Sequence, residues 1–241
     1  MSKVKTKTNK TFQIQIPHKI IRSSKMDCTT FFVYAKLVQL YRWRGSKSEV
    51  LAFDHTNFKY YTNIKSNQKL KKSLNKLYEM KLIRTKVDEL PRNQLLEIEI
   101  NSFFDLNKVG KEKEDRFSYT QLPYILLDKC MIDEIGHTGV RLLYYYESYT
   151  NRKKTFPFCF TSMRTIQKET GLSENTIIRY NKILEKNKLI DIKRHKLEMD
   201  GYIEDEFGNE RAYFQRYNNH YRVNIEQIYT LHEKLSQKNK I

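Results

Sequence analysis

The chain of 241 residues contains few glycines, 7 in all, and only 4 prolines. It has no G-x-x-x-x-G-K-[ST] sequence, and so few glycines leave little material for other nucleotide-cradling loops. No apolar run approaches the length of a transmembrane helix, and no hydrophobic segment follows the N-terminal lysines. The sequence therefore predicts a soluble, cytoplasmic protein that has neither a P-loop nor a membrane partner.

Cysteine and histidine are also scarce. Cys28, Cys130 and Cys159 lie far apart and form no CxxC pair, which predicts reduced thiols. The six histidines form no His-x-His pair of the kind that a tyrosine-nucleophile relaxase requires, and HExxH and G-x-S-x-G are both missing. Three consecutive tyrosines, 144–146, lie at helical spacing with neighbouring leucines, which favours core packing over catalysis. We therefore expect no catalytic residues, no enzymatic activity, no cofactor and no metal site.

Positive charge is abundant. Lys and Arg together number 45 against 28 Asp and Glu, a formal net charge of +17. Such an excess favours a polyanionic partner, and nucleic acid is the first candidate. A compositional bias of the coding sequence would scatter the lysines, whereas here they cluster. Hydrophobic residues make up 39% of the chain, which suffices for two small cores.

Residues 161–190 have the signals of two short helices joined by a tight turn. Ser162 is a predicted N-cap of the first helix, and Gly171 is placed to end it. Ser173 is the predicted cap of the second helix, which Glu174 opens with a charge that suits the positive end of the helix dipole. This pattern predicts a helix-turn-helix.

The second of these helices has two distinct faces. Ile177 and Leu184 are expected to be buried, together with either Ile178 or Asn181. The opposite face carries an amide and three cations at spacings i, i+4, i+7 and i+11, which suits a helix that enters the major groove of DNA. The predicted DNA-binding residues of this segment are Ser173, Asn175, Thr176, Arg179, Lys182 and Lys186.

A second copy of this pattern precedes it in the chain. Ile16-Pro17 matches Leu122-Pro123 at an offset of 106 residues, and Ser66 matches Ser173 at an offset of 107. Three further matches keep the offset of 107: Leu70 with Ile177, Leu77 with Leu184, and Leu82-Ile83 with Leu189-Ile190. A constant offset of this kind indicates duplicated domains. The predicted DNA-binding residues of the first copy are Ser66, Gln68, Lys69, Lys72, Asn75 and Lys76.

The predicted fold is α+β, with two tandem winged helix-turn-helix domains produced by internal duplication and a C-terminal helix. The expected order is a basic flexible arm at 1–11, the first winged-helix domain at 12–106, a linker at 107–118, the second winged-helix domain at 119–224 and the C-terminal helix at 225–241. The elements expected in the first copy are strands at 12–16 and 49–53, helices at 28–41, 56–61 and 66–80, and a wing from 82–83 to 95–100. Those expected in the second are a helix at 140–149, a strand at 155–160, and wing strands at 189–196 and 213–223 joined by a turn at 200–201 or 207–208.

Three segments keep alternative interpretations. The arm at 1–11 either lies along DNA phosphates or a minor groove, or is a frayed terminus. Residues 198–210 hold six acidic residues and no basic one, so phosphate would repel this wing. We expect a solvated hairpin there, with a contact to the replication or transcription machinery as the alternative; the spacing of a divalent-cation loop of the EF-hand type is missing. The helix at 225–241 either packs on its own domain or joins a homodimer.

The motifs of the second copy resemble those of a known class of protein. Tyr119-Thr-Gln-Leu-Pro, Gly171-Leu-Ser-Glu-Asn-Thr-Ile-Ile-Arg-Tyr and Leu184 with Leu189-Ile190 are similar to the N-terminal winged-helix domains of Gram-positive plasmid replication initiators. They are similar also to DnaD-type primosome proteins and their phage relatives. The tandem pair resembles iteron-binding initiators, in which two winged helices form a pseudo-dimer. The resemblance covers about residues 119–223 and implies replication initiation or control on a plasmid or phage.

Three functions therefore stay open. The first is a sequence-specific double-stranded DNA-binding protein that initiates or controls replication. The second is a transcriptional repressor or regulator with the same architecture, and the third is an interaction adaptor whose winged helices bind proteins. For Arg179, a structural role remains the alternative if its guanidinium pairs with Glu174 or Asp191.

Overall fold

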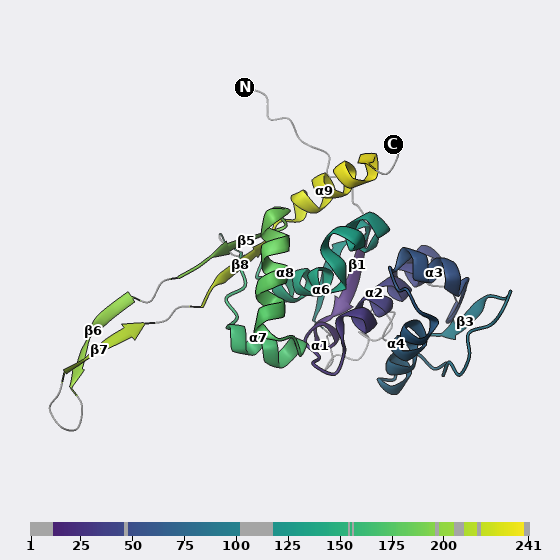
Figure 1. The fold of residues 1–241 in the computed structure, drawn as a ribbon, viewed down its shortest axis with the longest axis horizontal. Coiled ribbons are helices and arrows are strands. Elements are labelled where there is room, and N and C mark those ends of the chain that lie inside the picture. Colours follow the sequence, from purple (N-terminus) through teal and green to yellow (C-terminus); the bar gives the residue numbers. More distant parts are fainter. Residues whose placement is uncertain are drawn as a thin grey trace.

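The computed structural model describes residues 12–45, 48–101, 118–153, 155, 157–195, 198–204, 210–215 and 218–238, and for 198–204 and 210–215 the description is limited to the backbone. The predicted arm at 1–11 and residues 107–117 of the predicted linker lie outside these ranges. The fold is α+β, with helices and small two-stranded antiparallel sheets (Figure 1). Among the helices described, none is long and apolar enough to cross a membrane. The three cysteines are free, as predicted.

Three helices in the first half of the chain begin at polar N-caps. The carboxylate of Asp27 accepts from the backbone of α2, that of Asp54 from α3, and the Ser66 hydroxyl from α4, which fixes where each helix starts. The elements are β1 (Gln13–Pro17), α1 (His18–Ile21), α2 (Cys28–Trp43), β2 (Val50–Phe53), α3 (His55–Tyr61), α4 (Asn67–Glu79) and β3 (Leu96–Glu99).

The second half begins with a strand and a single 3-10 turn and ends in a long helix. Its elements are β4 (Tyr119–Pro123), η2 (Tyr124–Leu127), α6 (Lys129–Ser148), α7 (Met163–Thr170), α8 (Glu174–Lys186), β5 (Ile190–Lys193), β6 (Glu198–Glu204), β7 (Glu210–Gln215), β8 (His220–Val223) and α9 (Ile225–Lys238). The hairpin of β6 and β7 extends at one end of the molecule, and β3 lies at the other end (Figure 1).

Several details recur at the predicted offset of 107 residues. Lys81 and Lys188 both have a positive φ, of 56° and 57°, directly after α4 and α8. The backbone N–H of the next residue then donates back into the helix in both halves, from Leu82 to Leu77 and from Leu189 to Leu184, at 2.9 Å each. Such left-handed residues are a common way to end a helix. The repeat read from the sequence therefore has a counterpart in backbone geometry.

The two halves meet through an antiparallel pair of strands. In the register of β1 and β4, Gln15 lies opposite Gln121, which is its own counterpart at the offset of 106. Two copies of a segment paired in this way are related by a local two-fold axis. Ile14, Ile16 and Leu122 are fully buried at this junction, and α2 packs against α6 beside it. One hydrophobic core therefore includes residues from both halves.

Two arginines connect the halves further. Arg141, on α6, is fully buried and donates to the backbone carbonyls of Ser23 and Met26. Arg22 donates in the other direction, from Nε to Ser148 Oγ at 3.1 Å and from Nη2 to Ser148 O at 2.5 Å. Its guanidinium carbon lies 3.6 Å from the ring centroid of Tyr149. The connection between α1 and α2 is thus attached to α6 by charged hydrogen bonds.

A histidine at this junction makes stability depend on pH. Nε2 of His18 lies 3.0 Å from Thr120 Oγ1 across the two strands, and burial, aided by the charge of Arg22, lowers the pKa of His18 from 6.5 to about 4. The folded state therefore favours the neutral imidazole. This contribution is complete above pH 6.5 and is lost as the pH falls from 6.5 toward 4, because the unfolded chain binds the proton first.

We therefore expect His18→Gln to reduce the fall in stability between pH 6.5 and pH 4. Glutamine keeps a polar group opposite Thr120 but does not titrate. The measurement is urea unfolding of both proteins at several pH values in this window. The carboxylates contribute equally to the stability of both proteins at each pH. The difference between the two curves of unfolding free energy against pH therefore measures the contribution of His18. Curves that run parallel throughout the window would contradict this prediction.

Some predicted elements differ from the observed ones. The predicted helix at 140–149 begins earlier, at Lys129, and has a kink at Gly136, whose φ is 65°. In the described residues of the predicted strand at 155–160, the strand is reduced to one bridge between Cys159 and Tyr221. The first wing strand at 82–83 is reduced to a bridge between Ile83 and Ile100. β3 pairs with β2 instead. The alternative turn at 200–201 is wrong, because both residues lie within β6.

The C-terminal helix α9 packs on its own chain. Ile228 and Leu231 are buried, and the helix contacts α6, η2 and β4. Nε2 of His232 lies 2.9 Å from Asp128 Oδ2, just before α6. The apolar face of this helix is therefore occupied by the chain itself.

Candidate nucleic-acid interface

The segment from α7 to α8 is built as the sequence predicts. Ser162 Oγ accepts from the backbone N–H of Thr165, and Ser173 Oγ accepts from that of Thr176. Gly171 has a φ of 69°, a left-handed conformation that glycine adopts without strain, and it ends α7. A Cβ there would approach the backbone oxygen of Ser24 to 3.2 Å, so the turn also lies against the first half.

Of the two residues that the sequence allows on the buried face of α8, Ile178 and Asn181, the structure buries Asn181. Its exposed fraction is 5%, whereas that of Ile178 is 39%. The hydroxyl of Tyr146 donates to Asn181 Oδ1 at 2.7 Å, which satisfies a polar group between Ile177 and Leu184. The stripe that holds α8 against α6 is therefore apolar at both ends and hydrogen-bonded in the middle.

The opposite face of α8 is exposed and positively charged. Asn175, Arg179, Lys182 and Lys186 are all exposed. Within the described ranges, none of the three cations forms an ion pair. The guanidinium carbon of Arg179 lies 5.1 Å from the ring centroid of the neighbouring Tyr180. The alternative pairing of Arg179 with Glu174 or Asp191 is not observed. This face presents an amide and three cations to solvent.

The two polar residues at the start of α8 serve the cap. The hydroxyls of Ser173 and Thr176 lie 2.9 Å apart, and the same serine hydroxyl holds the first turn of the helix. Because these groups are engaged within the helix, Ser173 and Thr176 position it. Ser66 has the same role in α4, since its Oγ accepts from the N–H of Lys69 at 3.1 Å.

The corresponding face of α4 is exposed in part. Gln68, Lys69 and Lys72 are exposed, and in the described part of the chain none of them has an ion-pair partner. Lys76 differs, because its Nζ lies 2.9 Å from Glu79 Oε2. Asn75 differs too, because its amide donates to Val87 O at 2.9 Å and accepts from Val87 N at 2.8 Å. Asn75 therefore secures the segment after α4, because both its amide nitrogen and its amide oxygen are hydrogen-bonded to the backbone of Val87.

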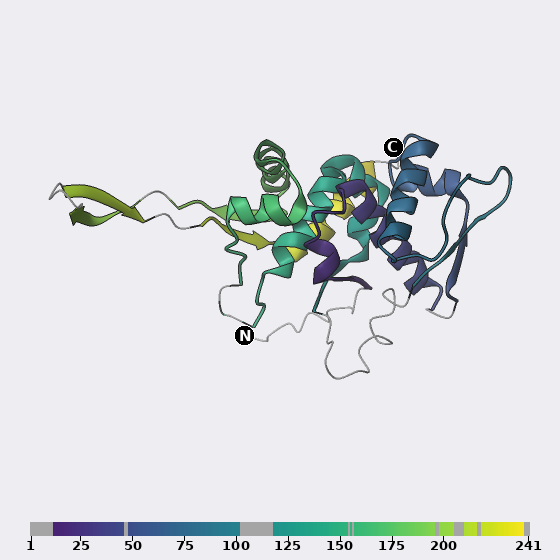
Figure 2. The ribbon, with the colours of Figure 1, turned by 90° about the horizontal axis from the view of Figure 1, so that it is seen from below.

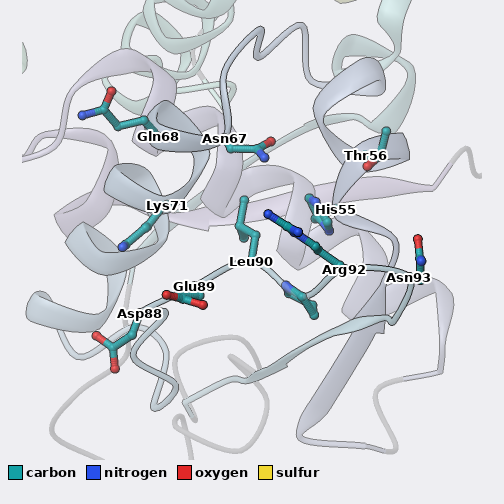
Figure 3. A pocket seen from close by; sticks show the side chains of 11 residues that line it. His55, Thr56, Asn67, Gln68, Lys71, Asp88, Glu89, Leu90, Arg92 and Asn93 are labelled. Carbon is teal, nitrogen blue, oxygen red and sulfur yellow. The ribbon is translucent and has the colours of Figure 1, made fainter.

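A pocket of about 680 Å³ opens beside the N-terminus of α4. Gln68 and Lys71 line it from the helix, and Arg92 reaches across it toward His55 from the segment between α4 and β3 (Figure 3). Asp88 and Glu89 lie on the same side as Lys71. The pocket is thus polar and of mixed charge, which suits a partner with both charged and hydrogen-bonding groups.

Several exposed cations near these helices were missing from the predicted set. They have no carboxylate partner among the described residues, and they flank the two predicted helices on neighbouring turns and loops. Their signal in the sequence is weak, because single lysines and arginines outside a helical stripe are common on any surface. They are Lys65 before α4, Arg92 after it, and Arg164 and Lys168 on α7.

One member of each helix pair, α7 and α4, lies along the same edge of the molecule (Figure 1). In Figure 1, α7, α1 and α4 follow one another along the lower edge, with α9 on the opposite edge. In Figure 2, seen from that lower edge, the purple α1 region lies between the green α7 and α8 and the blue α3 and α4. The helices α4 and α8 therefore lie on the two sides of the α1 region (Figure 2).

No protein-family model matches the chain, and no curated protein or solved structure was found that resembles it. The described residues contain no group of three or more His, Cys, Asp or Glu side chains that is arranged to hold a metal ion.

Proposed function

We propose that the protein binds double-stranded DNA sequence-specifically through two winged helix-turn-helix units, with α4 and α8 as the recognition helices. The observation that carries this proposal is the pair of capped helices, 107 residues apart, that each expose unpaired cations. Unpaired cations on a helix that is held from behind suit contacts with phosphates and base edges. The net charge of +17 supports the same partner.

The local two-fold axis between β1 and β4 supports the use of both units on one duplex. A two-fold relation between recognition elements matches a site with two half-sites about one helical turn apart. One chain would then supply what a dimeric regulator assembles from two. Together with the resemblance of residues 119–223, this arrangement favours a protein that initiates or controls the replication of a plasmid or phage.

The test begins with duplexes that the protein selects from a random pool. Hydroxyl-radical footprinting of the selected duplex is expected to show two protected regions about 10 base pairs apart, centre to centre. The logarithm of the affinity should fall linearly with the logarithm of salt concentration. Protection of a single groove would refute simultaneous docking, and affinity that is independent of salt would favour an adaptor for proteins.

Mapping of bound sites in cells distinguishes the two DNA-binding functions. Bound repeats at a replication origin would identify an initiator or a replication control protein. Bound operators at promoters would identify a transcriptional regulator instead.

A further inference from the structure

The connection between α1 and α2 lies between the two predicted recognition helices. On one side, the backbone of Ser24 lies against the turn between α7 and α8. On the other side, Ser23 and Lys25 line a pocket of about 690 Å³ together with residues at the C-terminal end of α4. This connection therefore lies between the α7–α8 pair and the α3–α4 pair (Figure 2).

The central pocket is rich in lysine. Lys19, Lys25 and Lys81 line it, all three are exposed, and no carboxylate in the described ranges pairs with them. A fourth lysine, Lys76, is neutralised by its ion pair with Glu79. Three positive charges are thus left around one hollow.

Nearby negative groups are already engaged. The carboxylate of Asp27 accepts from the N–H groups of Thr29 and Thr30 and from the Thr30 hydroxyl, so it serves as the cap of α2. The C-terminal end of α4 brings about half a negative charge, but the N–H groups of Met80, Lys81 and Leu82 already donate to its last carbonyls. Three full positive charges outweigh this partial one.

Two arginines hold the connection between α1 and α2 against the rest of the protein. Arg141 binds the carbonyls of Ser23 and Met26, and Arg22 is fixed to Ser148 and Tyr149. Lys25 is therefore presented by a backbone that is attached to α6 and does not need to be ordered when a ligand binds. A lower ordering cost raises affinity for a given set of contacts.

We propose that this central lysine pocket, formed by Lys19, Lys25 and Lys81, binds the phosphodiester backbone of the duplex between the two grooves that α4 and α8 enter. The proposal rests on the proposed function. Each lysine that neutralises a phosphate releases counterions, so each contact adds about 0.9 to the slope of log affinity against log salt. The pocket would therefore add affinity for all sequences and fix the spacing of the two half-sites.

The test compares Lys19→Gln/Lys25→Gln with wild type on a duplex selected by the wild-type protein. Ethylation interference on wild type should show two outer groups of essential phosphates and a central group between them. In the double variant the central group should disappear while the outer groups remain, and the salt slope should fall by about 1.8. Lys19→Arg/Lys25→Arg should restore both.

The control is Lys234→Gln/Lys238→Gln on α9, which changes the net charge equally and lies on the opposite edge (Figure 1). Central interference that persists in the first variant, or a slope change no larger than in the control, would overturn the assignment of the pocket and leave the proposed function intact. A wild-type protein that selects no duplex would overturn the proposed function and this inference together.

Discussion

Arg141→Ala is expected to lower the free energy of unfolding of the whole chain by about 3 kcal/mol or more. The substitution removes the donor of the buried Met26 carbonyl, at roughly 1–3 kcal/mol. It also removes one of two donors of the part-buried Ser23 carbonyl, which still accepts from the N–H of Met26. It also leaves the space of a large, fully buried side chain next to Phe31. Removal of the buried charge opposes these losses. Burial lowers the pKa of Arg141, and its Nε has no hydrogen-bond partner among the described residues, so the charged side chain is costly to bury.

Arg141→Met tests how much the cost of burying this charge offsets the losses. Methionine fills much of the space but leaves the Met26 carbonyl without the donor from Arg141, and leaves the Ser23 carbonyl with the N–H of Met26 alone. We expect it to be less destabilising than the alanine variant, because it relieves the same desolvation and leaves a smaller cavity. Urea unfolding followed by circular dichroism measures both variants against wild type. A methionine variant as stable as wild type would show that the two hydrogen bonds contribute no net stability.

The same measurement tests how the two halves are coupled. Because β1 pairs with β4 and Arg141 connects α6 to the connection before α2, we expect one cooperative transition that shifts as a unit. Two transitions, only one of which responds to Arg141→Ala, would show that the halves unfold independently.

The parts of this fold that the sequence predicted correctly depend on local signals. The serine caps of α4, α7 and α8 and the glycine after α7 act on their own helices within three or four residues. Their effect can therefore be predicted from the sequence without knowledge of the tertiary structure. The constant offset between the halves was informative for the same reason, since each half repeats its own local pattern.

The parts that the sequence did not predict depend on distant partners. Gln15 and Gln121 pair across 106 residues, and no local pattern of β1 selects β4. Residues 129–139 contain Gly136 and Gly139, which weaken a helical pattern. In the structure, α6 continues across a kink at Gly136, over which the ring of Tyr180 packs. Tertiary packing therefore decided where this helix begins.

In the candidate site, too, features that depend on local spacing were predicted and features that depend on distant partners were not. The exposed stripe on α8 follows from its spacing alone, and the structure bears out the exposure of all four residues. Asn75 and Asn181 look alike in sequence, yet one holds Val87 and the other accepts from Tyr146. Lys25 is not among the residues predicted to bind DNA, and the backbone before it is held between α4 and α8 by Arg141, 116 residues after Lys25 in the chain.

Arg179→Ala is expected to weaken binding to a selected duplex by about 1–3 kcal/mol and to weaken binding to random duplex much less. Arg179 lies in the second turn of α8, is exposed, and has no carboxylate partner in the part of the chain that is described. An arginine near the start of a recognition helix can donate two hydrogen bonds to O6 and N7 of a guanine. Binding to random duplex depends on phosphate contacts and not on base contacts, so it loses little when this side chain is removed.

Lys72→Ala is the matched comparison from the other half, because residue 72 is the counterpart of residue 179 at the offset of 107. If Lys72 contacts a phosphate, its loss should weaken all duplexes equally and lower the salt slope by about one unit. Fluorescence anisotropy on selected and random duplexes over a salt series measures both variants. Equal losses on the two duplexes for Arg179→Ala would make it a backbone contact. No loss on either would leave α8 without its proposed arginine reader of sequence, because the other exposed cations, Lys182 and Lys186, lie farther from the start of the helix.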